Sequence, residues 1–317
     1  MPLTLAAVRV SRKALAAGIV RENATWIHRR LAPCRSKQVP LAPSPQSPSP
    51  QPLIPSPQNA AHSIEFQDQA LEYQINMKFA VLCCTYARPH LLPHAIESFL
   101  RQDYPAHQRE MIILDDNGQY TSQSRDGWHL ISVAKRFRTL GEKRNAAAAL
   151  ASDDVDAYVV WDDDDIYLPH TLSAHREALR GADWSLPGEI LIEQKDGTLR
   201  TKSNRTLFHS AWAFTRSAFA KVDGYPFMQS GQDQALGARF RQAGIAPSDP
   251  TAKYPPYLIY RWSTSDSWHL SAMDKQTGYQ RLAAYRHQAP PIQQITPHWP
   301  RQYETLTAAP TALGQIP

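Results

Sequence analysis

Four consecutive carboxylates, at residues 162–165, follow a short run of mostly apolar, strand-forming residues at 157–161. Adjacent acids repel one another, and burial of a core gives no reason for them. At the carboxyl end of a buried strand they would converge on one crevice, where a divalent cation that prefers hard oxygen ligands could offset the repulsion. The alternative is a solvated acidic turn that caps the helix expected after Pro169. The aromatic and apolar strand in front favours a site.

Polar residues follow two further apolar runs in the same way. Thr85 and Tyr86 come directly after residues 79–84, and Asp115 and Asp116 come after residues 111–114. The carboxyl ends of parallel strands meet at one edge of a sheet, where ligands bind in α/β proteins. These side chains are therefore candidates for the same crevice as the four acids.

Strands and amphipathic helices alternate in the first part of the chain, which predicts a mostly parallel sheet of the α/β class. Strands are expected at 79–84, 111–114, 130–133 and 157–161, and helices at 91–100 and 140–152. The later part is less regular. It is expected to hold a hairpin around Asp196-Gly197, strands at 207–214 and 257–262, and helices at 216–222 and 232–242.

The domain boundaries follow from composition. Residues 1–62 are basic and then proline-rich, with eight prolines between Pro40 and Pro57, and we expect them to form a disordered extension. For residues 1–76 as a whole, the composition leaves three interpretations open: a targeting segment, a linker or an upstream mis-start. Residues 63–76 are expected to be a linker or peripheral helix, residues 77–290 the folded domain, and residues 291–317 a loose tail.

The cysteine pattern and the distribution of charge limit the function classes. Cys34, Cys83 and Cys84 have no zinc-binding spacing, and the adjacent pair lies in an apolar run, which fits a reducing, cytoplasmic compartment. Residues 1–76 hold eight basic and four acidic residues, which leaves 26 basic and 25 acidic residues for the rest. A nearly neutral folded part does not favour nucleic acid as a partner or acceptor. No apolar run approaches the ~20 residues of a transmembrane segment.

Five segments in order make the chain resemble the family 2 glycosyltransferases of the GT-A fold between about residues 77 and 271. They are FAVLCCTYARPHLLPHAIESFLRQDYP, IILDDNG, LGEKRNAAAALA, YVVWDDDDIYLP and GYPFMQSGQDQALGARF. The resemblance implies a Rossmann-like, mostly parallel central sheet flanked by helices, with a smaller hairpin region on the acceptor side. It also implies a hexosyltransferase that uses a nucleotide-diphosphate sugar, with UDP-sugars favoured, and an unknown hydroxyl acceptor.

The resemblance implies a set of donor-binding residues. Tyr86 is placed to stack on the base and Asp116 to accept a hydrogen bond from it, and Arg144 is placed for the diphosphate or the base. Asp115 could instead hold its turn, and Lys143 could be a solvated residue at the start of a helix. The full donor set that the resemblance implies is Thr85, Tyr86, Arg88, Asp115, Asp116, Lys143, Arg144, Asp162 and Asp163.

The metal-binding DXD element of the family can be placed on residues 162–164. This placement implies that Asp163 reaches the ribose and that Asp164 binds Mn²⁺ or Mg²⁺, with Asp162 in support. Magnesium-type ions take few protein carboxylates, so Asp165 is expected to be a structural bystander. The resemblance also suggests His269 as a further metal ligand, although a lone histidine is more often structural.

The catalytic base implied by the resemblance is Asp233, which precedes a helical run. Many members of the family have Glu-Asp at this position, whereas this chain has Gln232 before Asp233. The alternative for Asp233 is the N-cap of the following helix. His209 lies in an apolar run, and we expect it to be a partly buried strand residue that faces the acceptor rather than a catalyst.

Two other function classes fit part of the pattern. A catalytically inactive sugar-nucleotide or carbohydrate-binding module would keep the fold without turnover. Gln232, which replaces the usual Glu, is the one residue in the sequence that favours this class. A metal-dependent nucleotidyl or phosphoryl transferase would also use clustered aspartates. The sequence has no glycine-rich phosphate loop of the Walker type to support that class.

Overall fold

The structure is a computed structural model, and it describes residues 77–194, 196–204, 208–261 and 290–303. The predicted extension at 1–62, the predicted linker at 63–76, the candidate ligand His269 and the tail after residue 303 all lie outside the described residues.

Strands β1, β2, β4 and β5 and helices α4 and α5 form close to their expected positions, and the structure adds the short strand β3. The strands are β1 (Phe79–Thr85), β2 (Arg109–Asp115), β3 (Gln123–Arg125), β4 (Trp128–Ser132), β5 (Ala157–Asp162), β6 (Ile166–Tyr167), β7 (Trp184–Ser185), β8 (Glu189–Glu193), β9 (Leu199–Ser203), β10 (Ala213–Thr215), β11 (Pro247–Ser248) and β12 (Leu258–Tyr260). The helices are α4 (Leu92–Leu100), α5 (Leu140–Ala149), α6 (Thr171–Leu179), α7 (Arg216–Lys221) and α8 (Gln232–Gln242), with single 3₁₀ turns η1 (Ala106–Gln108), η2 (His209–Ala211) and η3 (Pro250–Ala252). Within the described part of the chain, no helix has the length and apolar character needed to cross a membrane.

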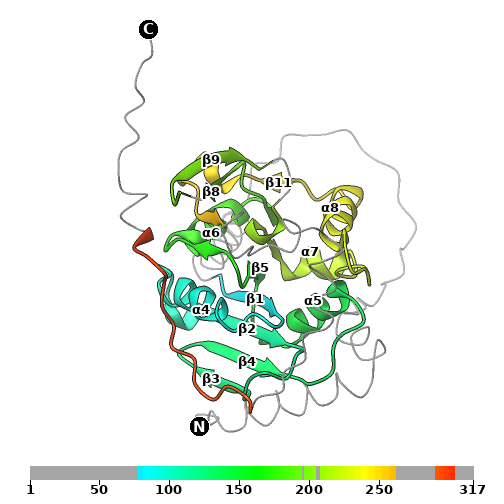
Figure 1. Cartoon of the computed structure of the whole chain (residues 1–317). Coiled ribbons are helices and arrows are strands. Elements are labelled where there is room, and N and C mark those ends of the chain that lie inside the picture. Colours follow the sequence, from blue (N-terminus) through cyan, green and yellow to red (C-terminus); the bar gives the residue numbers. More distant parts are fainter. Residues whose placement is uncertain (1–76, 195, 205–207, 262–289, 304–317) are drawn as a thin grey trace, which may run out of the picture.

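The central sheet has eight strands in the order β11-β7-β10-β5-β1-β2-β4-β3. Its middle, β5-β1-β2-β4, is entirely parallel, and β10 and β3 join antiparallel on either side. Helices flank the sheet (Figure 1). The predicted α/β class, with a mostly parallel central sheet flanked by helices, is confirmed.

Strand β1 is buried on both faces, which explains its continuous apolar sequence. Phe79, Val81 and Cys83 face one core, together with α4, while Ala80 and Leu82 face the other, together with the alanines of α5. Figure 1 shows α4 and α5 on opposite sides of this part of the sheet. The two helices thus fix the depth and tilt of β1, and with it the loop that follows.

The smaller sheet has the order β6-β12-β8-β9 and contains the predicted hairpin. Strands β8 and β9 pair antiparallel, and their turn includes Gly197 at a φ of +81°, a conformation that favours glycine. Strand β6 begins four residues after β5 ends, so the acidic turn at 163–165 connects the two sheets.

The strand expected at 207–214 is largely wrong. His209–Ala211 is a 3₁₀ turn, and only Ala213–Thr215 is a strand. A strand would point the adjacent side chains of His209 and Ser210 to opposite faces. In the turn, His209 contacts Arg144 and Ser210 contacts Asp165. Both side chains therefore contact residues at the same edge of the central sheet.

Residues 291–303, expected to be part of a loose tail, pack along the outside of the domain (Figure 1). Ile292 pairs with Tyr120 through a backbone bridge, and Trp299 donates its indole N–H to Ser98 Oγ at 2.9 Å. Tyr303 is 1% exposed and donates to Glu193 at 3.1 Å. The segment therefore ties the far edge of the central sheet to the small sheet through α4.

His175 of α6 makes the stability of the fold dependent on pH. Its side chain is fully buried, with Nδ1 2.9 Å from Ser185 Oγ, and burial lowers its pKa to about 3. The unfolded chain binds a proton below about pH 6.5 while the folded chain does not, so stability falls as the pH drops below 6.5. For this one group the loss between pH 7.5 and 5.5 is about 1.4 kcal/mol. The free energy of unfolding can be measured with urea at pH 7.5 and pH 5.5. Its fall between the two pH values is expected to be smaller by this amount in His175→Gln than in wild type. The exposed-site control His107→Gln is expected to behave as wild type, and equal pH dependence in all three proteins would contradict the assignment.

Candidate active site at the carboxyl edge of the central sheet

The sheet register brings the predicted site residues together. Thr85 at the end of β1 pairs with Asp115 at the end of β2, and Cys84 pairs with Asp162 at the end of β5. Parallel strands have their carboxyl ends on one edge, so the loops after β1, β2 and β5 share a crevice.

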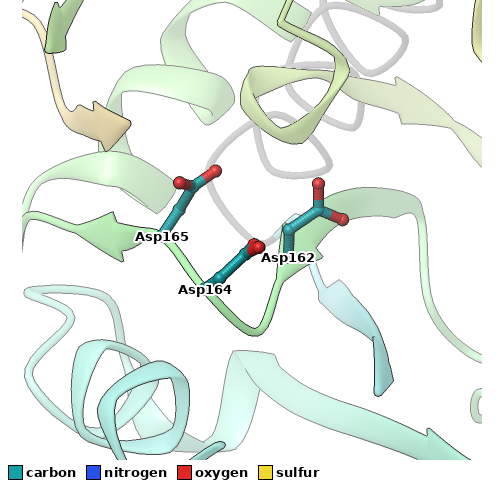
Figure 2. Close-up of side chains that lie close together, drawn as sticks. All are labelled: Asp162, Asp164 and Asp165. Carbon is teal, nitrogen blue, oxygen red and sulfur yellow. The ribbon is translucent and has the colours of Figure 1, made fainter. Parts of the chain in front are cut away.

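Three of the four consecutive aspartates converge. One carboxylate oxygen from each of Asp162, Asp164 and Asp165 can be chosen such that all lie within 4.8 Å of one another. Their side chains project to the same side of the turn after β5 (Figure 2). Asp164 was predicted as a ligand, and the structure adds Asp162 and Asp165 beside it. Asp165, expected to be a bystander, is thus a member of this cluster.

Asp163 lies apart from the cluster. It is fully buried, accepts a hydrogen bond from Thr85 Oγ1 at 2.6 Å and pairs with Arg88, which also donates to Asp164 at 2.5 Å. Burial raises the pKa of Asp163 to about 6, against the opposing effect of the Arg88 charge. The structure places this carboxylate against protein groups, and its predicted contact with the ribose stays a prediction.

Residues distant in sequence hold the acidic turn in shape. Arg261, which is 2% exposed, donates from Nε to the Asp164 carbonyl at 2.5 Å and from its backbone N–H to the Asp165 carboxylate at 3.3 Å. Ser210 Oγ donates to the other Asp165 oxygen at 2.9 Å. The sequence analysis missed both residues. The only available signal was the position of Arg261 directly after the last strand.

A pocket opens beside the cluster and contains five predicted donor-binding residues. They are Thr85, Tyr86, Arg88, Asp116 and Lys143. Six residues that were not predicted complete the lining: Cys84, Arg136, Phe137, Thr139, Leu140 and Gln229. Three of these, Arg136, Phe137 and Thr139, come from the loop before α5, whose irregular sequence carries no periodic signal.

Asp115 and Asp116 have different surroundings. Asp115 accepts hydrogen bonds from the backbone N–H groups of Asn117 and Gln119, both at 3.1 Å, and from Ser132 Oγ at 2.7 Å. Burial raises its pKa, although these bonds oppose the shift. The turn-holding alternative for Asp115 agrees with these contacts, whereas Asp116 lines the pocket.

Lys143 is buried, so the interpretation as a solvated residue at the start of a helix is wrong. It is 5% exposed, and its Nζ donates to the Thr85 carbonyl at 2.6 Å and to the Asp116 carboxylate. Asp116 also accepts from the Phe137 backbone N–H at 3.1 Å. These contacts fix the Asp116 carboxylate at the pocket wall.

Arg144 connects the cluster to a buried histidine. It donates to Asp162 at 3.2 Å and to His209 Nδ1 at 2.7 Å. Arginine can only donate, so Nδ1 of His209 accepts and its proton lies on Nε2, 3.0 Å from Tyr225 Oη. Burial and the Arg144 charge hold the pKa of His209 well below its ordinary value. His209 is therefore neutral and positions Arg144, and it lies buried in a 3₁₀ turn instead of the expected strand.

Asp233 is the second residue of α8 and is partly exposed. The N-cap of α8 is Gly231, which makes no side-chain cap, so the capping alternative for Asp233 is not observed. Asp233 neither lines the pocket nor belongs to the carboxylate cluster. Negative charge, from Asp162 first and also from Asp233, raises the pKa of Arg144 against the opposing effect of its burial.

One family of known proteins and several solved structures are similar to this chain. Residues 80–223 match the family described as Glycosyl transferase family 2. TarS from S. aureus in complex with UDP-GlcNAc is 17% identical, with a TM-score of 0.46 over 64% of this chain and 64% of that chain. Another TarS structure is 17% identical, with a TM-score of 0.45 over 58% of this chain and 37% of that chain. The mannosyltransferase PcManGT from Pyrobaculum calidifontis, in complex with GDP-Man and Mn²⁺, is 16% identical, with a TM-score of 0.44 over 73% of this chain and 75% of that chain.

This chain thus spans less than two thirds of either TarS structure. The curated proteins include no match to it.

Proposed function

We propose a reaction for this chain from the premise that it is a glycosyltransferase with a family 2 domain over residues 80–223, as the resemblance predicted. The reaction is the transfer of a sugar from a nucleotide-diphosphate donor, with UDP-sugars favoured, to an acceptor hydroxyl with inversion. One observation carries the proposal: Arg88, which lines the pocket together with Tyr86 and Asp116, donates to Asp164 of the three converging aspartates.

The pocket supplies the donor contacts. The Tyr86 ring offers a face on which a base can stack, and Asp116, fixed by Lys143 and the Phe137 N–H, accepts a hydrogen bond from the base. Arg88 and Lys143 also line the pocket, and they offer N–H donors to the diphosphate, although protein carboxylates already balance their charges. Arg144 is held by His209 and donates to Asp162, so it orients that carboxylate.

The residues of the acidic cluster fit a divalent metal. Asp162, Asp164 and Asp165 offer hard oxygen atoms within 4.8 Å of one another, which is the ligand type that Mn²⁺ and Mg²⁺ prefer. We assign these three carboxylates as metal ligands. His269, which the sequence suggests as a ligand, is a further candidate. When bound, such an ion would neutralise charge on the diphosphate as it leaves.

Asp233 is proposed as the general base. It removes the proton from the acceptor hydroxyl, whose oxygen forms a bond to the anomeric carbon while the bond from that carbon to the diphosphate oxygen breaks. The nucleotide diphosphate leaves with the electron pair of the broken bond. Partial exposure at the start of α8 leaves the Asp233 carboxylate accessible to an acceptor.

The experiment that tests the function measures hydrolysis and transfer with a panel of UDP-, GDP- and dTDP-sugars in the presence of Mn²⁺. We expect release of the nucleotide diphosphate from at least one donor and loss of this release in EDTA. A protein that binds these donors without any turnover would instead be a sugar-nucleotide-binding module. Release of pyrophosphate or transfer of phosphate would indicate a nucleotidyl or phosphoryl transferase.

A further inference from the structure

Arg136 is an exposed arginine at the rim of the donor pocket, and the sequence analysis did not select it. Its guanidinium carbon lies over the Tyr86 ring, 3.6 Å from the ring centroid. This is the ring on which the proposed function stacks the nucleobase. The guanidinium and the base would therefore compete for one surface.

The other basic residues around the pocket already neutralise protein carboxylates. Arg88 pairs with Asp163 and Asp164, and Lys143 pairs with Asp116. Arg136 forms no ion pair with any acidic residue in the described part of the chain. A nucleotide diphosphate that enters the pocket brings negative charge, and Arg136 is the lining residue whose positive charge is still available to it.

The backbone next to Arg136 is held in place, while its side chain reaches into solvent. The Phe137 N–H donates to Asp116 at 3.1 Å, and Thr139 caps α5 by accepting from the Glu142 N–H at 3.1 Å. Exposed arginine side chains change rotamer on the picosecond to nanosecond timescale. The guanidinium can therefore leave the ring without any movement of the loop.

We propose that Arg136 binds the donor diphosphate and that its stacking on Tyr86 is the resting position of the unliganded protein. The nucleobase takes the ring face, and the displaced guanidinium pairs with a phosphate oxygen. The exchange is favourable because an exposed cation–π contact is weak, whereas arginine and phosphate form charge-assisted, bidentate hydrogen bonds. This inference rests on the proposed function, since it presumes that a nucleotide diphosphate enters this pocket.

UDP and uridine differ only in the diphosphate, so a comparison of their affinities shows whether Arg136 binds the diphosphate or only stacks on Tyr86. Binding of UDP and of uridine is measured with Mn²⁺ by isothermal titration calorimetry or NMR, for wild type, Arg136→Ala and Arg136→Lys. We expect Arg136→Ala to raise the Kd for UDP about tenfold or more, and to leave the Kd for uridine unchanged or lower it. Arg136→Lys keeps the charge and is expected to recover part of the UDP affinity.

Lys135→Ala is the matched control, because Lys135 is an exposed neighbour of the same charge that does not line the pocket. It is expected to bind both probes as wild type does. Tyr86→Ala removes the shared surface and is expected to weaken both. Equal weakening of UDP and uridine in Arg136→Ala, or no weakening of either, would overturn the role in diphosphate binding.

The same measurements show whether only the role of Arg136 is wrong or whether the proposed function is wrong as well. If wild type releases UDP from a UDP-sugar but Arg136→Ala binds UDP equally well, only the role of Arg136 is wrong. If wild type binds neither UDP nor GDP and turns over no donor, both proposals are wrong.

Discussion

Replacing Asp164 by asparagine is expected to lower sugar transfer by on the order of 10³-fold, because a metal ion bound at the diphosphate contributes several kcal/mol to stabilisation of the transition state. Asp164 belongs to the converging cluster and is 2% exposed. Asparagine keeps the size of the side chain but removes the charge that a divalent ion needs. The measurement is the rate of transfer at saturating donor, over a titration of Mn²⁺.

The adjacent Asp163 provides the contrast for this experiment. Its carboxylate is buried against Thr85 and Arg88 rather than in the cluster, so Asp163→Asn is expected to lower the melting temperature. Asp164 also pairs with Arg88, but its charge lies beside those of Asp162 and Asp165, so Asp164→Asn relieves repulsion as it removes the ion pair and is expected to lower the melting temperature less. Asp154→Asn, an exposed acid that pairs with Lys78, is the control for a simple loss of charge. If Asp164→Asn retained wild-type transfer, or if Asp163→Asn and Asp164→Asn behaved alike, the division of the four acids would be wrong.

Replacing Asp233 by asparagine is expected to lower kcat by ~10²- to 10⁴-fold, the range that a positioned general base supplies. Asp233 lies outside the pocket and the cluster, so the Kd for UDP is expected to stay unchanged. The measurement combines steady-state transfer with UDP titration in the presence of Mn²⁺. A binding module, in contrast, would have no turnover to lose.

Gln234 provides a control on the same turn of α8. It is exposed and directly follows Asp233, so Gln234→Ala tests whether any change at the start of this helix disturbs transfer. We expect Gln234→Ala to keep wild-type kcat. A fall in UDP affinity in Asp233→Asn that matched its fall in kcat would assign Asp233 to donor binding and exclude it as the base.

The elements that carry the site were predictable where their sequence pattern has one structural solution. The apolar run of β1 is continuous because the strand is buried between two cores, and α8 extends over the residues that its pattern indicated. Five predicted donor residues line one pocket because parallel strands share an edge. Periodicity and the order of motifs were sufficient for this part of the prediction.

The roles of the four adjacent aspartates were not predictable in the same way. The direction of each carboxylate depends on a tight turn that Arg261 and Ser210 hold, and these residues are 97 and 45 positions away from their partners. The position of Arg136 over Tyr86 likewise depends on how the loop before α5 folds back onto the end of β1. Long-range contacts of this kind leave no local pattern in a sequence.

In the proposed function, Asp162, Asp164 and Asp165 hold a divalent ion, and this ion joins the donor diphosphate to the protein. The most direct measurement is the affinity of the wild-type protein for UDP by isothermal titration calorimetry, in Mn²⁺ and in EDTA. We expect EDTA to weaken UDP binding at least about tenfold, since the pocket then holds the diphosphate with its basic residues alone. Equal affinity for UDP in Mn²⁺ and in EDTA would contradict it.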